Sequence, residues 1–242
     1  VAMGITGTDV SKEAAAMVLL DDNFATIVAA VEEGRAINDN VRAFLKYSLA
    51  GNLGKVLLVF LAPLIGLPLP LLPFQILWLN LVTDGVLGLG IGVERAQRDT
   101  MQRPPRPPSE GVLAAGLSRQ ILWLGTLLGA LNLAVAWWAF STGQQGFQTI
   151  VMTTVVLLQI VAAHAGRSPS ESLFRLNPLT NRALLAGTAL VLALQVVVAY
   201  FPPLQSLFGT AALTIPQLAV PLAAAGFLIA VLEIFKRKTL KG

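Results

Sequence analysis

Cysteine is absent from this chain of 242 residues, and the only histidine is His164. The lack of thiols excludes a disulfide framework and a thiolate metal site, and one imidazole excludes a cluster of histidine ligands. Charged residues are also scarce, at 12%, whereas 55% of the residues are hydrophobic. A water-soluble domain of this size needs more charge to cover its surface, so the composition indicates a membrane protein.

The first residues, Val1–Ile5, lack the features of a secretory signal. They contain no basic segment, no long apolar run and no initiator methionine. They read instead as part of a buried strand. We therefore expect the chain to begin inside a domain whose larger part lies outside it.

Six apolar stretches are long enough to cross a bilayer, which takes roughly 20 helical residues. They lie at about Tyr47–Gly66, Leu71–Gly92, Leu117–Phe140, Phe147–Ala165, Ala183–Phe201 and Leu213–Phe235. The sequence therefore predicts an α-helical membrane protein with six transmembrane helices in a bundle.

Cations alternate along these spans. Lysine and arginine precede the first span, lie between the second and third and between the fourth and fifth, and follow the sixth. The intervening loops, about 67–70, 141–146 and 202–212, carry no charged residue. The positive-inside rule then predicts that both ends of the chain are cytoplasmic. The net charge of +4 therefore reflects topology and not a nucleic-acid surface, which would gather its cations on one face.

The segment Ala25–Lys46 has apolar residues at helical spacing with charged residues between them. It enters the first apolar stretch without a proline or another stop signal. We expect one long helix that continues into the first span and can carry mechanical information between a soluble domain and the bilayer.

Two ionisable residues, Lys55 and Asp84, fall near the middle of the first two spans. Lys55 lies 14 residues before Leu69, in the turn between these spans, and Asp84 lies 15 residues after it. At 1.5 Å per helical residue, both are roughly 20 Å from the turn, so the two charges should meet. Ionisable groups at this depth are costly, which makes them candidates for a functional site.

Polar side chains accompany both charges. Asn80 and Thr83 share a helix face with Asp84, and Asn52 lies three residues before Lys55. Carboxylate, amide and hydroxyl oxygens suit a hard cation such as Ca²⁺, Mn²⁺, Mg²⁺ or Na⁺. The alternative is a buried ion pair that only joins two helices, which does not require the neighbouring asparagines and threonine.

Three glycines, Gly51, Gly54 and Gly85, allow close helix approach or local unwinding beside these residues. Gln159 in the fourth span is a further candidate ligand. Its alternative role is a hydrogen bond between helices.

Several segments resemble the P2-type cation-transporting ATPases. Val1–Ala15 is similar to the end of their phosphorylation domain, and Asp21–Phe24 and Glu32–Arg35 continue the match. Leu77–Gly85, which reads LWLNLVTDG, resembles the sixth membrane helix of the calcium-pump group. The resemblance covers essentially the whole chain and fades after about Arg106.

This resemblance implies a domain organisation. Residues 1–24 would be the C-terminal remnant of an α/β (HAD-like) phosphorylation domain, 25–46 a cytoplasmic stalk helix, and 47–242 a six-helix transport and support domain holding helices five to ten. The implied partners are the lipid bilayer and the remainder of the pump, namely its actuator, nucleotide-binding and phosphorylation domains and its first four helices. The short loops and alanine-rich spans indicate a bacterial source, and we expect the location to be a bacterial plasma membrane.

The family's catalytic motifs are absent from this chain. It contains neither Asp-Lys-Thr-Gly-Thr, which carries the phosphorylated aspartate, nor Thr-Gly-Asp-Gly-Val-Asn-Asp. ATP and Mg²⁺ would therefore bind to other domains of the pump, and we expect no ATP hydrolysis by this stretch alone. By the same resemblance, Asp84, Asn80 and Thr83 would bind the transported ion.

Departures from the family pattern concern the ion. Two-site calcium pumps carry glutamate where this chain has Lys55 and Gln159, and usually proline where it has Leu87. An ammonium group would act as a built-in counter-cation and repel a second ion. We therefore expect one divalent cation, Ca²⁺ or Mn²⁺, per cycle, with Lys55 moving onto Asp84 when the ion leaves.

Three alternatives remain. A pump for protons or monovalent cations would also accommodate Lys55. An ion-coupled secondary transporter would need inverted-repeat halves, but the first three spans do not resemble the last three. A non-catalytic membrane scaffold is the third.

Overall fold

The computed structural model describes residues 1–97, 99–104, 111, 113, 114, 116–168 and 171–239. It divides into two compact units. One comprises Val1–Asp39 and Arg95–Pro107, and the other comprises Asn40–Glu94 and Pro108–Gly242. Each unit is described by itself.

The first unit begins with a small strand–helix–strand element. Strand β1 (Ala2–Met3) pairs in parallel with β2 (Val18–Leu19), and helix α1 (Asp9–Ala14) connects them. Parallel strands need such a crossover, because a tight hairpin joins only antiparallel strands. The identity of this element as part of a phosphorylation domain stays a prediction.

Asp22 ties the two loops of this element together. Its carboxylate accepts hydrogen bonds from the backbone N–H groups of Ile5 (2.9 Å) and Thr6 (2.8 Å) and from the Thr6 hydroxyl (2.7 Å). The bond from the Ile5 N–H, followed by those from Thr6, holds the pKa of the Asp22 carboxyl below its usual value. The loop after β2 is thereby fixed to the loop after β1.

A single helix, α2 (Ala25–Leu64), runs for 40 residues and passes from the first unit into the second. The sequence predicted this continuity, because no strong stop signal interrupts the helical pattern and Pro63 occurs only in the last turn. Within the first unit, the Arg35 guanidinium donates to the backbone oxygens of Thr100 (3.0 Å) and Arg103 (2.8 Å). Arg103 in turn pairs with Asp39 at 2.8 Å.

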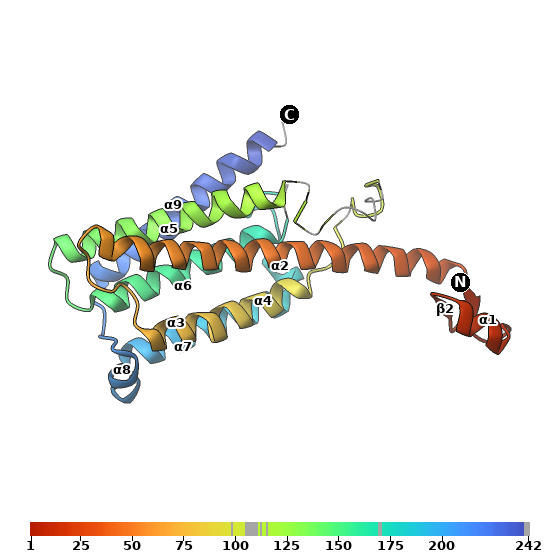
Figure 1. Ribbon diagram of the computed structural model, residues 1–242, viewed down its shortest axis with the longest axis horizontal. Helices are drawn as coiled ribbons and strands as arrows, with labels where there is room; N and C mark the ends of the chain where they lie inside the picture. Colours follow the sequence, from red (N-terminus) through yellow and green to blue (C-terminus); the bar gives the residue numbers. More distant parts are fainter. Residues whose placement is uncertain (98, 105–110, 112, 115, 169–170, 240–242) are drawn as a thin grey trace. The chain divides into compact units, whose positions relative to one another are not determined.

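The second unit is a helical bundle (Figure 1). After α2 it contains α3 (Pro73–Trp78), a π-helical turn η1 (Leu79–Asp84), α4 (Gly85–Gly92), α5 (Leu117–Ser141), α6 (Phe147–Gly166), a 3₁₀ turn η2 (Pro178–Thr180), α7 (Arg182–Tyr200), α8 (Pro202–Phe208) and α9 (Ile215–Thr239). Among the described residues, six helices are long and apolar enough to cross a membrane. This confirms the six predicted spans. The helix ends lie within two residues of the predicted ends, except that α2 begins at Ala25, well before the first predicted span, and α9 continues to Thr239.

Helix α8 was not predicted. Its seven residues occupy the loop expected at 202–212, where Pro202 and Pro203 open the helix and Gly209 ends it with a positive φ of 62°. Proline is compatible with the first turn of a helix, and glycine adopts positive φ without steric cost. Short helices of this kind have too few residues for a hydrophobic period.

Helix α6 lies at the centre of the bundle and packs against α4, α5, α7 and α9. Two of its buried threonines have hydrogen-bond partners inside the protein. The Thr154 hydroxyl donates to the Ile150 carbonyl at 2.8 Å, and the Thr149 hydroxyl accepts from the backbone N–H of Ala211 at 2.8 Å. A helix buried on all sides needs such partners, because the interior offers no water.

Glycines allow helices α4 and α7 to pack closely against each other. A Cβ atom added to Gly90 would lie 2.7 Å from the Leu184 Cα atom, and one added to Gly187 would lie 3.0 Å from a Val86 methyl group. The first contact involves backbone and cannot be relieved by a rotamer change. Both helices must shift if Gly90 gains a side chain.

We therefore expect Gly90→Ala to lower the midpoint of thermal unfolding, at a cost of about 1–3 kcal/mol for overpacking. Gly92→Ala is the matched control, because nothing lies within 4 Å of the Cβ atom that it would add in the same helix. Unfolding of both variants in detergent checks this expectation, and equal midpoints would contradict the close contact.

Candidate functional site

The Lys55 ammonium and the Asp84 carboxylate form an ion pair within the bundle. The distance from Lys55 Nζ to Asp84 Oδ2 is 2.6 Å, and the two side chains are 7% and 12% exposed. Lys55 lies on α2, and Asp84 is the last residue of η1. The helical rise alone predicted this meeting, because both residues lie equally far from the intervening turn.

Asn80 completes the environment of the ammonium group. The Lys55 ammonium donates to Asn80 Oδ1 as well as to Asp84. Both acceptors belong to η1, a π-helical turn within an otherwise α-helical span. Such turns are rare and occur frequently at functional sites. The backbone stays helical at Gly85, where the sequence had allowed for local unwinding, and the widened turn precedes this glycine.

Tyr47 is a member of the site that the sequence analysis missed. Its hydroxyl lies 3.5 Å from Asp84 Oδ1, at the limit of a hydrogen bond, and the residue is 2% exposed. It stands eight residues before Lys55 on α2. A tyrosine at the start of an apolar stretch normally indicates a membrane interface. Nothing in the sequence around Tyr47 therefore predicted that it contacts Asp84.

Gln159 of α6 also reaches the site. Its amide lies close enough to the Asp84 carboxylate to interact with it, yet neither of its polar atoms has a hydrogen-bond partner among the described residues. A Cβ atom on Gly51 would lie 3.0 Å from Gln159 Nε2. The glycine thus leaves room for a buried amide whose oxygen is available to a ligand.

The other two predicted ligands are less closely engaged. Thr83 is fully buried and its hydroxyl oxygen has no partner within the described chain, but no contact joins it to Lys55. Asn52 is half-buried and makes no hydrogen bond to a residue that the structure describes. A Cβ atom added to Gly54 would lie 2.9 Å from the Leu128 Cβ atom of α5, whereas nothing lies within 4 Å of one added to Gly85.

One face of the site is open. Asn80 is exposed although it lies in an apolar span, and its neighbours Leu77 and Leu81 are 58% and 71% exposed. The described residues contain no group of three histidines, aspartates or glutamates that could hold a metal ion. Asp84 is the acidic residue that pairs with the Lys55 ammonium within the described part of the chain, and a multivalent ion would need further oxygen ligands.

The donor set can exchange one cation for another. Carboxylate, amide and hydroxyl oxygens bind hard cations, and here the Lys55 ammonium occupies the carboxylate and one amide oxygen. An incoming cation would compete with the ammonium for the same oxygens, because two positive charges at this separation repel strongly in a low dielectric. The arrangement is therefore chemically suited to alternate between a protein-borne and a diffusible cation.

The chain is similar in sequence to known cation-transporting ATPases. A family model described as "Cation transporting ATPase, C-terminus" matches residues 68–238. A calcium-transporting ATPase of Bacillus subtilis is 44% identical over 217 residues, which cover 88% of this chain and 24% of that protein. A probable cation-transporting ATPase F of Mycobacterium tuberculosis is 39% identical over 221 residues, with coverages of 89% and 24%. The chain thus spans about a quarter of the length of the curated relatives that it matches.

Removing one member of the ion pair should destabilise the bundle. We expect Lys55→Met to cost about 3–5 kcal/mol, because it leaves the Asp84 carboxylate buried without a counter-charge. The double variant Lys55→Met with Asp84→Asn should recover most of this loss. Thermal unfolding of the two single variants and the double variant measures the coupling, and purely additive losses would show that the pair contributes nothing.

Proposed function

Because this chain belongs to the family of cation-transporting ATPase C-termini, we propose that it supplies part of the transmembrane ion site of an ATP-driven cation pump. The observation that carries this proposal is the Lys55–Asp84 pair, 2.6 Å long and buried among apolar helices. A charge in this position is costly and marks an ion pathway by default.

The proposed cargo is one divalent cation per cycle, Ca²⁺ or Mn²⁺. Asp84 and Asn80 are its principal ligands, and Thr83 and Gln159 contribute oxygens that have no other partner in the described part of the chain. Asn52 stays a candidate ligand that would have to turn toward the site. One of the relatives is named a calcium-transporting ATPase, which supports a divalent cargo.

Lys55 is the proposed built-in counter-cation. Its ammonium bonds Asp84 and Asn80, and in the proposed cycle it returns to these oxygens when the cation leaves. When a cation binds, the ammonium leaves these oxygens but stays nearby, and its charge disfavours a second divalent ion. The Tyr47 hydroxyl, which lies near Asp84, would close the site on the side of the N-terminal half of α2.

The remainder of the pump supplies the energy in this proposal. ATP and Mg²⁺ bind to its cytoplasmic domains, one of which is phosphorylated on aspartate, and helix α2 transmits their motion as the stalk. Residues 1–24 then belong to the phosphorylation domain, 25–46 to the stalk and 47–242 to the membrane domain. Both ends of this stretch are cytoplasmic, the membrane is a bacterial plasma membrane, and the stretch by itself does not hydrolyse ATP.

A pump for protons or monovalent cations is the second candidate. It is favoured by the single carboxylate at the Lys55 ammonium, since the ion pair leaves no net negative charge to attract a divalent ion. The family membership supports a pump over a secondary transporter or a scaffold.

The first test screens the full-length pump for ATPase activity with Ca²⁺, Mn²⁺, Mg²⁺, Na⁺ and K⁺. We expect Ca²⁺ or Mn²⁺ to activate the wild-type protein and Asp84→Asn to abolish activation, because the principal anionic ligand is lost. Glu171→Gln, which changes an exposed carboxylate, is the control. Activation that survives Asp84→Asn would refute the site, and activation by Na⁺, K⁺ or acid alone would favour the second candidate.

The second test counts cations transported per ATP in reconstituted vesicles. Lys55→Glu adds an anionic ligand and removes the counter-cation, so we expect a higher ratio of ions to ATP. Lys55→Ala should change the net charge moved per cycle. Ratios and charge transfer equal to those of the wild type would exclude Lys55 as a counter-cation.

A further inference from the structure

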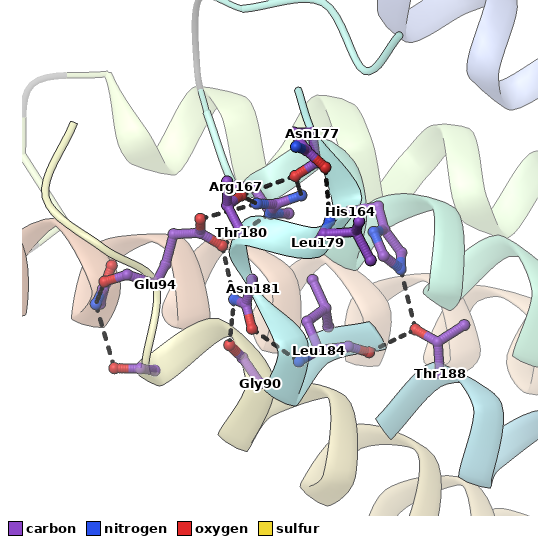
Figure 2. A network of polar contacts seen from close by, with 12 residues as sticks. Gly90, Glu94, His164, Arg167, Asn177, Leu179, Thr180, Asn181, Leu184 and Thr188 are labelled. Carbon is purple, nitrogen blue, oxygen red and sulfur yellow. Dashed lines mark hydrogen bonds and ion pairs between the residues drawn. The ribbon is translucent and has the colours of Figure 1, made fainter. Parts of the chain in front are cut away.

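A second buried charge pair, Glu94 with Arg167, lies just after the end of α4 (Figure 2). The Arg167 guanidinium, at the end of α6, donates to both carboxylate oxygens of Glu94, with Nε–Oε2 and Nη2–Oε1 distances of 2.8 and 3.0 Å. The side chains are 3% and 14% exposed. Two-pronged arginine–carboxylate contacts of this kind fix orientation as well as distance.

Asn181 joins the same pair to two helix ends. Its amide N–H₂ donates to Glu94 Oε2 (2.7 Å) and to the Gly90 carbonyl of α4 (2.8 Å), and its oxygen accepts from the Leu184 backbone N–H at the start of α7 (2.8 Å). One buried side chain therefore caps the end of α4 and the beginning of α7 together.

Arg167 and His164 extend the contacts from α6. Arg167 also donates to the Thr180 hydroxyl at 2.6 Å. One turn earlier, His164 Nε2 lies 3.0 Å from the Thr188 hydroxyl of α7, which itself donates to the Leu184 carbonyl. The hydroxyl oxygen thus accepts from the imidazole. Charged and neutral bonds together join α4, α6 and α7 at this level (Figure 2).

Helix α2 is attached to the end of α4 differently. The Asn40 amide donates to the backbone carbonyls of Gly92 (3.2 Å) and Glu94 (2.8 Å). These are neutral bonds to main-chain oxygens, which are weaker than charge-assisted bonds. Phe44 lies against Gly88, where an added Cβ would be 2.6 Å from the ring, and an apolar contact of this kind has no preferred direction.

From this contrast we propose that Glu94 and Arg167 are positioning residues for Asp84. They fix the helix that carries Asp84 to α6 and α7, so that loading of the site separates Lys55 from Asp84 by movement of α2 against a stationary α4. Glu94 lies ten residues after Asp84 and two residues after the last residue of α4. The close Gly90–Leu184 contact helps to keep the intervening segment rigid. The inference rests on the proposed function.

If α4 were released, it would follow α2, and the Lys55–Asp84 bond would persist when it should break. The cation would then compete with an ammonium group that stays in place. The expected result is a weaker apparent affinity for the cation with little change in the maximal rate. Loss of supporting contacts around a metal ligand typically costs about tenfold or more in affinity.

The test measures Ca²⁺ activation of ATP hydrolysis by the full-length pump, with Mn²⁺ in its place if Mn²⁺ is the better activator. Glu94→Gln and Arg167→Lys should each raise the half-saturating cation concentration about tenfold while the maximal rate stays within twofold. Glu171→Gln, the exposed control, should change neither. A purely structural role would lower the amount of active protein and the maximal rate but not shift the half-saturating concentration.

Half-saturating concentrations within twofold of the wild type in folded Glu94→Gln and Arg167→Lys would overturn the proposal. If Glu94→Gln does not fold, Arg167→Lys decides alone, because it keeps both buried charges while it loses the two-pronged contact with Glu94 and the bond to Thr180. Asp84→Asn separates the two levels of inference. If cation activation survives Asp84→Asn, the ion site itself is refuted. If Asp84→Asn abolishes activation but the Glu94 and Arg167 variants have the half-saturating concentration of the wild type, only the positioning role is refuted.

Discussion

The ion pair between Lys55 and Asp84 constrains how α2 packs against the rest of the bundle. Each charge alone is too costly to retain in a hydrocarbon environment, and the pair is tolerated only because the two groups lie 2.6 Å apart with Asn80 as a third partner. Helix α2 must therefore pass beside η1 at one fixed depth. Gly54 allows α2 to pack closely on α5, and Gly51 allows it to pack beside Gln159. The glycines of α2 thus help to hold Lys55, on the same helix, at the depth of Asp84.

The parts of this structure that depend on local chemistry were predictable. A span needs a sufficient number of apolar residues, and the six stretches satisfied that requirement without knowledge of their neighbours. The meeting of Lys55 with Asp84 was also predictable, since both residues belong to one hairpin and helical rise is constant. The relation of Ala2–Met3 and Val18–Leu19 to a larger α/β domain stays a prediction, as do the roles of Asn52 and Thr83.

Contacts between residues that are far apart in the chain could not be predicted from the sequence. Glu94 and Arg167 are separated by 73 positions, and only the packing of α4 against α6 and α7 brings them together. Tyr47 has the sequence context of an interfacial anchor, yet its hydroxyl reaches Asp84. No residue in Leu79–Asp84 demands a π-helical turn, and the Lys55 ammonium that bonds two of its residues lies on another helix.

That turn divides the second span into two helical phases. A π-helical turn holds one residue more than an α-helical turn, so α3 and α4 are rotated by about 100° from the phase of one uninterrupted helix. In the α3 segment, the Gln75 amide faces α8 and donates to the Phe208 carbonyl at 2.9 Å. In α4, Gly90 faces α7 and packs against Leu184. The two halves of one span can thus match different neighbours, and the ligands of the candidate site occupy the joint between them.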